Sequence, residues 1–151
     1  MTLTPVAPDA ESQLLPLTRW LRDRGAGVSA TQFAQALVAM QQHARRALVA
    51  LAPYDAVLTP TLAQPPALVG ALRNDSDPAA DFAAQKAFTP FTAVWNVTGM
   101  PAVSLPLHWT AEGLPVGVML AARPGEDASL LGLAGQIEAA RPWRDRRSPL
   151  W

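Results

Sequence analysis

The chain has 151 residues, half of them hydrophobic, which is enough for one domain with a sizeable core or for a piece of a larger domain. Twelve basic and twelve acidic residues balance, which argues against nucleic-acid binding, because a phosphate backbone requires a net basic surface. Cysteine is absent, which excludes disulfides, thiolate metal ligands and a cysteine nucleophile. We expect a cytoplasmic protein, since no apolar run reaches the roughly 18 residues of a membrane span and the first residues do not resemble a secretory signal.

The first part of the chain predicts a flexible segment followed by a helix. Residues 1–10 are rich in proline and lack periodicity, so we expect a flexible lead-in to a single α/β unit over residues 11–151. Apolar residues at helical spacing between 11 and 24 predict the helix. It should begin near Pro16, where the missing N–H costs nothing, and end at Gly25 and Gly27, in the left-handed conformation that glycine allows.

The next pattern predicts a long amphipathic helix. Residues 29–32, Ser-Ala-Thr-Gln, match a capping box, in which a hydroxyl and a side-chain amide satisfy backbone groups at the helix start. Pro53 ends this helix, because proline cannot continue the backbone hydrogen-bond pattern. The apolar stripe, at steps of three and four residues, consists of Phe33, Leu37, Met40, Ala44, Leu48 and Leu51.

A short strand, a long loop and two helices should follow. Residues 56–59, Ala-Val-Leu-Thr, are typical of a short buried strand. Residues 61–77 are rich in Pro, Gly, Asn and Asp without periodicity, and a loop of this length suggests a functional or surface-covering role. Asp-Pro at 77–78 predicts the start of a helix to about residue 88, and a second short helix is expected over 90–96.

The last third of the chain predicts a pair of strands and a final helix. Two proline-introduced apolar runs, 100–106 and 114–120, should be neighbouring strands joined by a polar loop that contains Gly113. A glycine and two acids at 125–127 open the last helix, which Pro142 ends. Strands and helices therefore interleave, and the predicted class is α/β, with a small sheet of about three strands covered by helices.

No common catalytic signature is present in the sequence, which contains no G-x-S-x-G, H-E-x-x-H, P-loop or G-x-G-x-x-G motif. Two histidines, His43 and His108, have no serine and acid near them in a recognisable order. The single lysine, Lys86, stands among alanines and is expected to be solvated, and an enzyme that uses Lys86 with Asp81 is the weakest alternative. We expect no catalytic set, metal or cofactor in this chain.

Several blocks of the sequence resemble the amidase signature family. Residues 54–61, YDAVLTPT, are similar to its D-x-(hydrophobic)-L-x-P-T segment. Residues 91–106, FTAVWNVTGMPAVSLP, are similar to its F-T-x-x-x-N-x-T-G-x-P-A-x-S-x-P segment, and residues 113–118, GLPVGV, continue the match. These blocks follow the family's order over residues 25–143, and together they resemble the C-terminal third of such an enzyme.

The resemblance implies a serine hydrolase of carboxylic amides, built on one α/β/α domain with a large mixed sheet. The family's Ser–cis-Ser–Lys set and oxyanion hole lie around a Gly/Ser-rich signature in the first half of a chain about three times this length. This sequence has no Gly-Gly-Ser-Ser stretch and no lysine in a matching context. We therefore expect the chain to complete the sheet, to wall the substrate pocket and to be inactive alone.

The resemblance also implies substrate-binding residues. The segment before the first strand of the predicted pair runs past the acyl side of the family's active site, which makes Thr92, Trp95 and Asn96 the candidates. An aromatic ring with a neighbouring hydroxyl and amide suits an apolar cleft with a few orienting contacts. The alternative is that Trp95 only packs and Asn96 bonds the backbone of a turn completed by Gly99. Thr61 is a weaker pocket candidate.

Two hypotheses about function and partners stay open. In the first, the partner is the missing N-terminal part of an amidase, and the intact enzyme acts on a small amide. In the second, the chain is a non-catalytic α/β module that self-associates, as a dimer or larger assembly, or binds another partner. Exposed strand edges and an apolar face at 103–105 and 116–120 favour such association. Neither hypothesis involves nucleic acid or a membrane.

Overall fold

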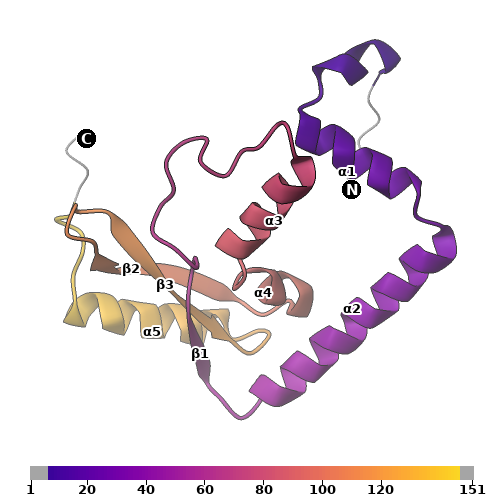
Figure 1. Ribbon diagram of the computed structural model, residues 1–151. Coiled ribbons are helices and arrows are strands. Elements are labelled where there is room, and N and C mark those ends of the chain that lie inside the picture. Colours follow the sequence, from indigo (N-terminus) through magenta and orange to yellow (C-terminus); the bar gives the residue numbers. More distant parts are fainter. Residues whose placement is uncertain (1–6, 147–151) are drawn as a thin grey trace. The chain divides into compact units, whose positions relative to one another are not determined.

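The computed structural model describes residues 7–146, so most of the expected lead-in, residues 1–6, lies outside the described part. The chain divides into two compact units (Figure 1). We call them the helical unit, Met1–Ala39 with Ala67–Phe88, and the sheet unit, Met40–Pro66 with Thr89–Trp151.

The helical unit contains the 3-10 helix η1 (Pro8–Gln13), the helices α1 (Pro16–Ala26) and α3 (Pro78–Phe88), and the first turns of α2 (Ala30–Leu51). Proline occupies the first turn of α1, as the sequence predicts. Residues 8–10, expected to be part of the flexible lead-in, already belong to η1.

A tilted aromatic contact joins α1 to α3 in the helical unit. The rings of Trp20 and Phe82 are 6.0 Å apart between centroids, at an interplanar angle of 54°. The guanidinium of Arg24 lies 5.0 Å from the centroid of the Trp20 ring, and the ammonium of Lys86 lies 4.9 Å from that of Phe82. Each cation is thereby held over an aromatic face, a contact that contributes about 0.5 to 1 kcal/mol at an exposed site.

The capping box at the start of α2 is confirmed. The Ser29 N–H donates to Gln32 Oε1 at 2.9 Å, and the Gln32 N–H donates to Ser29 Oγ at 3.2 Å. The apolar stripe of α2 is less buried than its periodicity predicts, because no described residue of this helix is fully buried and Phe33 is 56% exposed. Only Leu48 and Leu51, at the C-terminal end of the stripe, pack against a buried core cluster.

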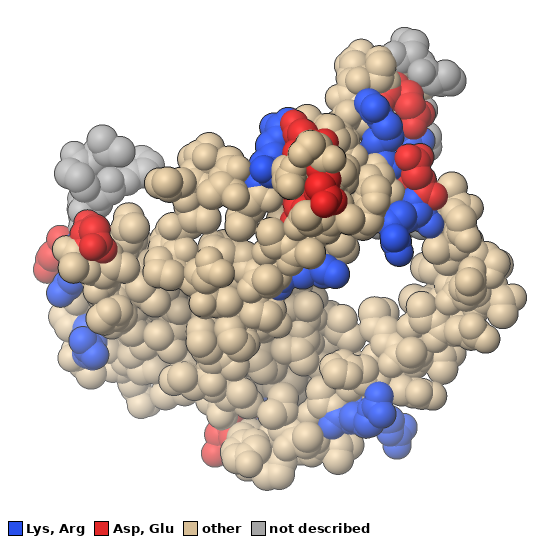
Figure 2. Space-filling view, viewed as in Figure 1, with Lys and Arg blue, Asp and Glu red and all other residues tan. Residues whose placement is uncertain are grey.

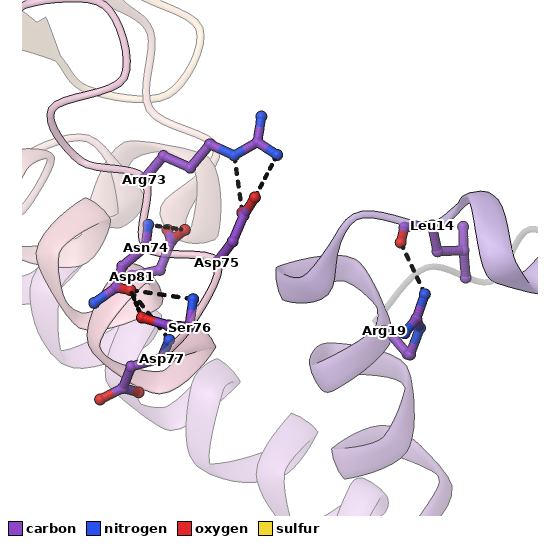
Figure 3. A network of polar contacts seen from close by, with 8 residues as sticks. All are labelled: Leu14, Arg19, Arg73, Asn74, Asp75, Ser76, Asp77 and Asp81. Atoms are coloured by element: carbon purple, nitrogen blue, oxygen red, sulfur yellow. Dashed lines mark hydrogen bonds and ion pairs between the residues drawn. The ribbon is translucent and has the colours of Figure 1, made fainter.

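The loop before α3 is stabilised by side chains that bond its own backbone (Figure 3). Asn74 Oδ1 accepts hydrogen bonds from the N–H groups of Ser76 and Asp77, at 3.2 and 3.1 Å. Asp77 Oδ1 accepts from the Ala80 N–H at 3.0 Å, which confirms Asp77 as the cap of α3. The loop is therefore irregular but hydrogen-bonded, as expected for turn-forming residues.

The sheet unit is built on a three-stranded antiparallel sheet in the order β1-β3-β2. Its strands are β1 (Ala56–Pro60), β2 (Ala102–Trp109) and β3 (Pro115–Ala122). Its helices are α4 (Ala93–Thr98), α5 (Asp127–Ala140) and the last turns of α2. The predicted pair of neighbouring strands, β2 and β3, is confirmed, and β3 lies between β1 and β2. The predicted α/β class, with a small sheet of three strands and helices packed on it, is confirmed as well.

Helices cover both faces of this sheet. We call the side of the sheet that packs against α5 the α5 face, and the side that packs against α4 the α4 face. Buried aliphatic side chains of β2, β3 and α5 form the core of the α5 face, namely Leu105, Leu120, Ala122, Leu130 and Ala134. The α4 face carries a second cluster, Trp95, Met100, Met119 and Ala121, against which the end of α2 also packs. Alternation along β3 produces this division, since successive side chains of a strand point to opposite faces.

Candidate functional site

The short helix α4 is bounded by residues that the sequence marks as helix breakers. Thr89-Pro90 separates it from α3, and Gly99 ends it in the left-handed conformation, with φ of 70°. The Thr98 hydroxyl donates to the carbonyl oxygens of Val94 and Trp95, at 2.8 and 3.3 Å. Because the helix continues to Thr98, the expected turn around Asn96 does not form, and that interpretation is wrong.

The three substrate-binding candidates lie on α4 or at its start, in different surroundings. Thr92 is the N-cap residue, and its hydroxyl donates to the Thr89 carbonyl oxygen at 3.3 Å. Asn96 is exposed one turn later. Trp95 is 6% exposed and packs in the core of the α4 face, and its Nε1 has no hydrogen-bond partner in the described part of the chain. Thr92 and Asn96 are therefore placed together, and Trp95 is directed into the sheet.

A group of hydroxyl side chains lies on the same face of the sheet. Thr59 and Ser104 are both directly opposite Met119 of β3, so all three side chains point to the α4 face. Thr61 follows two residues after Thr59, and its N–H donates to the Gly117 carbonyl oxygen at 3.1 Å. Across β3, Thr61 Oγ1 and Ser104 Oγ are 2.6 Å apart and share a hydrogen bond.

Gly117 provides the space for this hydroxyl pair. A Cβ atom at position 117 would lie 2.7 Å from Ser104 Oγ, 2.7 Å from Thr61 Oγ1 and 3.1 Å from Thr61 Cβ. Thr61 was a weaker candidate from the sequence, whereas Ser104 and Gly117 were missed. A strand glycine signals close approach of another group, but only the strand register shows which group approaches.

The two side chains of the remaining candidate pair, Lys86 and Asp81, each contact other groups. Asp81 is 3% exposed and accepts hydrogen bonds from the Asn74 N–H and from Gln85 Nε2, at 3.0 and 2.6 Å. Lys86 lies over the Phe82 ring instead. No ion pair joins the two groups within residues 7–146, so the geometry lends no support to an enzyme based on them.

The two acids whose pKa values shift lie in loops. The pKa of Asp75 is lowered, first by the hydrogen bonds from Arg73, whose Nε donates to Asp75 Oδ1 at 2.8 Å (Figure 3). The pKa of Glu112, in the loop between β2 and β3, is lowered by a hydrogen bond from Thr110. Both acids are exposed, which favours a local structural role over acid–base chemistry.

Two kinds of feature are absent from residues 7–146. Among residues 7–146, no three His, Asp or Glu side chains are grouped so that they can hold a metal ion. None of the described helices is both long enough and apolar enough to cross a membrane. On the face shown in Figure 2, uncharged residues make up most of the surface.

Comparison with known proteins decides the family. The family model described as Amidase matches residues 6–131 of this chain. The chain belongs to the amidase family. This finding confirms the resemblance to the C-terminal part of an amidase signature enzyme and the α/β class of the fold.

Related amidases are much longer than the matched region. The chain is 42% identical over 115 residues to "Putative amidase AmiC" of Mycobacterium tuberculosis (strain ATCC 25618 / H37Rv), a match that covers 76% of this chain and 24% of the relative. The corresponding protein of Mycobacterium leprae (strain TN) is 39% identical over 121 residues, covering 80% of this chain and 26% of the relative. This chain therefore spans about a quarter of the length of these relatives.

Solved structures also match nearly all of this chain along only part of their own length. A structure of 6-aminohexanoate cyclic dimer hydrolase matches 97% of this chain and 31% of its own, with a TM-score of 0.84 and 26% identity. A crystal structure of an amidase matches 87% of this chain and 30% of its own, with a TM-score of 0.71 and 27% identity. The fold is thus that of a fragment of the amidase architecture.

Proposed function

We propose that this chain is the C-terminal region of a hydrolase of carboxylic amides, and that the Ser–cis-Ser–Lys catalytic set lies outside it. The observation that carries the proposal is the match of 97% of this chain to 31% of 6-aminohexanoate cyclic dimer hydrolase. The sequence itself contains no Gly-Gly-Ser-Ser stretch, and its single lysine lies over a phenylalanine ring. The region would supply strands and pocket wall rather than reacting groups.

In this proposal α4 contributes to the wall of the pocket. Thr92 and Asn96 lie one turn apart, so their hydroxyl and amide can orient a bound substrate from the same side of the helix. The buried indole of Trp95 supplies apolar surface and holds α4 against β3 through its packing with Met119 and Ala121. A serine on the missing part would attack the amide carbon and release the amine, and water would then hydrolyse the acyl-enzyme.

The chain is expected to be inactive alone, and labelling with a fluorophosphonate serine probe tests this. The purified chain is incubated with the probe and examined by intact-mass spectrometry, with an active serine hydrolase as the positive control. We expect no saturable adduct, because an unactivated serine hydroxyl is a weak nucleophile. A saturable adduct at one serine of this chain would overturn the proposal.

A second candidate function is a non-catalytic module that self-associates or binds the rest of an amidase. Leu58 of β1 favours it, because this side chain points to the α5 face and is 66% exposed. The outer edges of β1 and β2 also have no neighbouring strand in the described part of the chain, and such edges recruit other strands. Light scattering tests this: a concentration-dependent dimer supports it, and a monomer at high concentration contradicts self-association.

A further inference from the structure

We draw no further inference here: the strongest candidate, the apolar groove that Met40, Ala44 and Leu48 of α2 form with Val97 of α4, lies open in a chain that spans about a quarter of the length of its relatives, and nothing in the structure shows what covers it.

Discussion

The two faces of the β1-β3-β2 sheet differ in composition, although the same three strands form both. The α5 face is made of aliphatic side chains, with Leu105 and Leu120 packed against Leu130 of the helix. The α4 face combines the buried Trp95 with hydroxyl groups and a glycine that makes room for them. We therefore expect the α5 face to contribute more to stability than the α4 face, where a hydroxyl pair and a glycine stand among the apolar side chains.

The largest expected effect is on the α5 face. Leu130→Ala should lower the free energy of unfolding by about 2 to 5 kcal/mol, because it leaves a cavity in a buried aliphatic cluster. Leu131→Ala is the matched control on the same helix, since Leu131 is 65% exposed, and should change stability by less than about 0.5 kcal/mol. Urea denaturation measures both, and equal losses would show that α5 does not pack as described.

A smaller effect is expected where the α4 face is tight. Gly117→Ala should destabilise the chain by about 1 to 3 kcal/mol, because the added methyl group collides with both members of the hydroxyl pair. Gly132→Ala in α5 is the matched control, since its Cβ would meet no neighbour, and it should stabilise the helix by about 0.5 to 1 kcal/mol. A neutral Gly117→Ala variant in urea denaturation would contradict the close approach across β3.

The hydroxyl pair itself should contribute little to stability. A double-mutant cycle of Thr61→Val and Ser104→Ala should give a coupling energy of about 0.5 to 1.5 kcal/mol, the usual value for one neutral hydrogen bond. Chemical denaturation of the four proteins measures it. A coupling energy near zero would mean that the two hydroxyls do not form a hydrogen bond in solution. The α4 face would then differ less from the α5 face than the structure indicates.

The smallest effect is expected outside the sheet, from Asp75. Its folded-state pKa is lowered by Arg73, so its contribution to stability is present above the ordinary aspartate pKa and is lost as the pH falls through the lower, folded-state pKa. An NMR titration of the carboxyl group should give a pKa below that of a free aspartate. Arg73→Gln should return it to the ordinary value, and an unchanged pKa in this variant would exclude the ion pair as the cause.

Much of the local structure follows from the sequence. Pro16, the capping box at Ser29 and Gln32, and the cap at Asp77 mark helix starts, and each is confirmed. These signals can be found in the sequence because they depend on residues close in the chain: a proline in the first turn at Pro16, and local hydrogen bonds at the other two. The prediction of a turn at Asn96 was wrong, because α4 continues through that position to Thr98 and ends at Gly99. The Thr98 hydroxyl donates to the Val94 carbonyl oxygen in the last turn of the helix. Local competition between a turn and one more helical residue is decided by packing, which the sequence does not contain.

The candidate site could be predicted only in part. The family resemblance points to Thr92, Trp95 and Asn96, and the structure shows that Trp95 faces the core whereas Asn96 is exposed. Ser104 and Gly117 could not be found, because their meeting with a residue at the end of β1 depends on strand order and register. Periodicity likewise shows that α2 has an apolar stripe but not what covers it.

The most direct test of the central claim is to map which face of the sheet an amide approaches. Hexanamide carrying a nitroxide on its far end is added to the ¹⁵N-labelled chain, and the broadening of backbone signals reports proximity. The account predicts strong broadening at Thr92 and Asn96, which lie at the start of α4 and on it, and little at the N–H groups of α5. Broadening centred on α5, or spread evenly over both faces, would contradict the division between a stabilising face and a binding face.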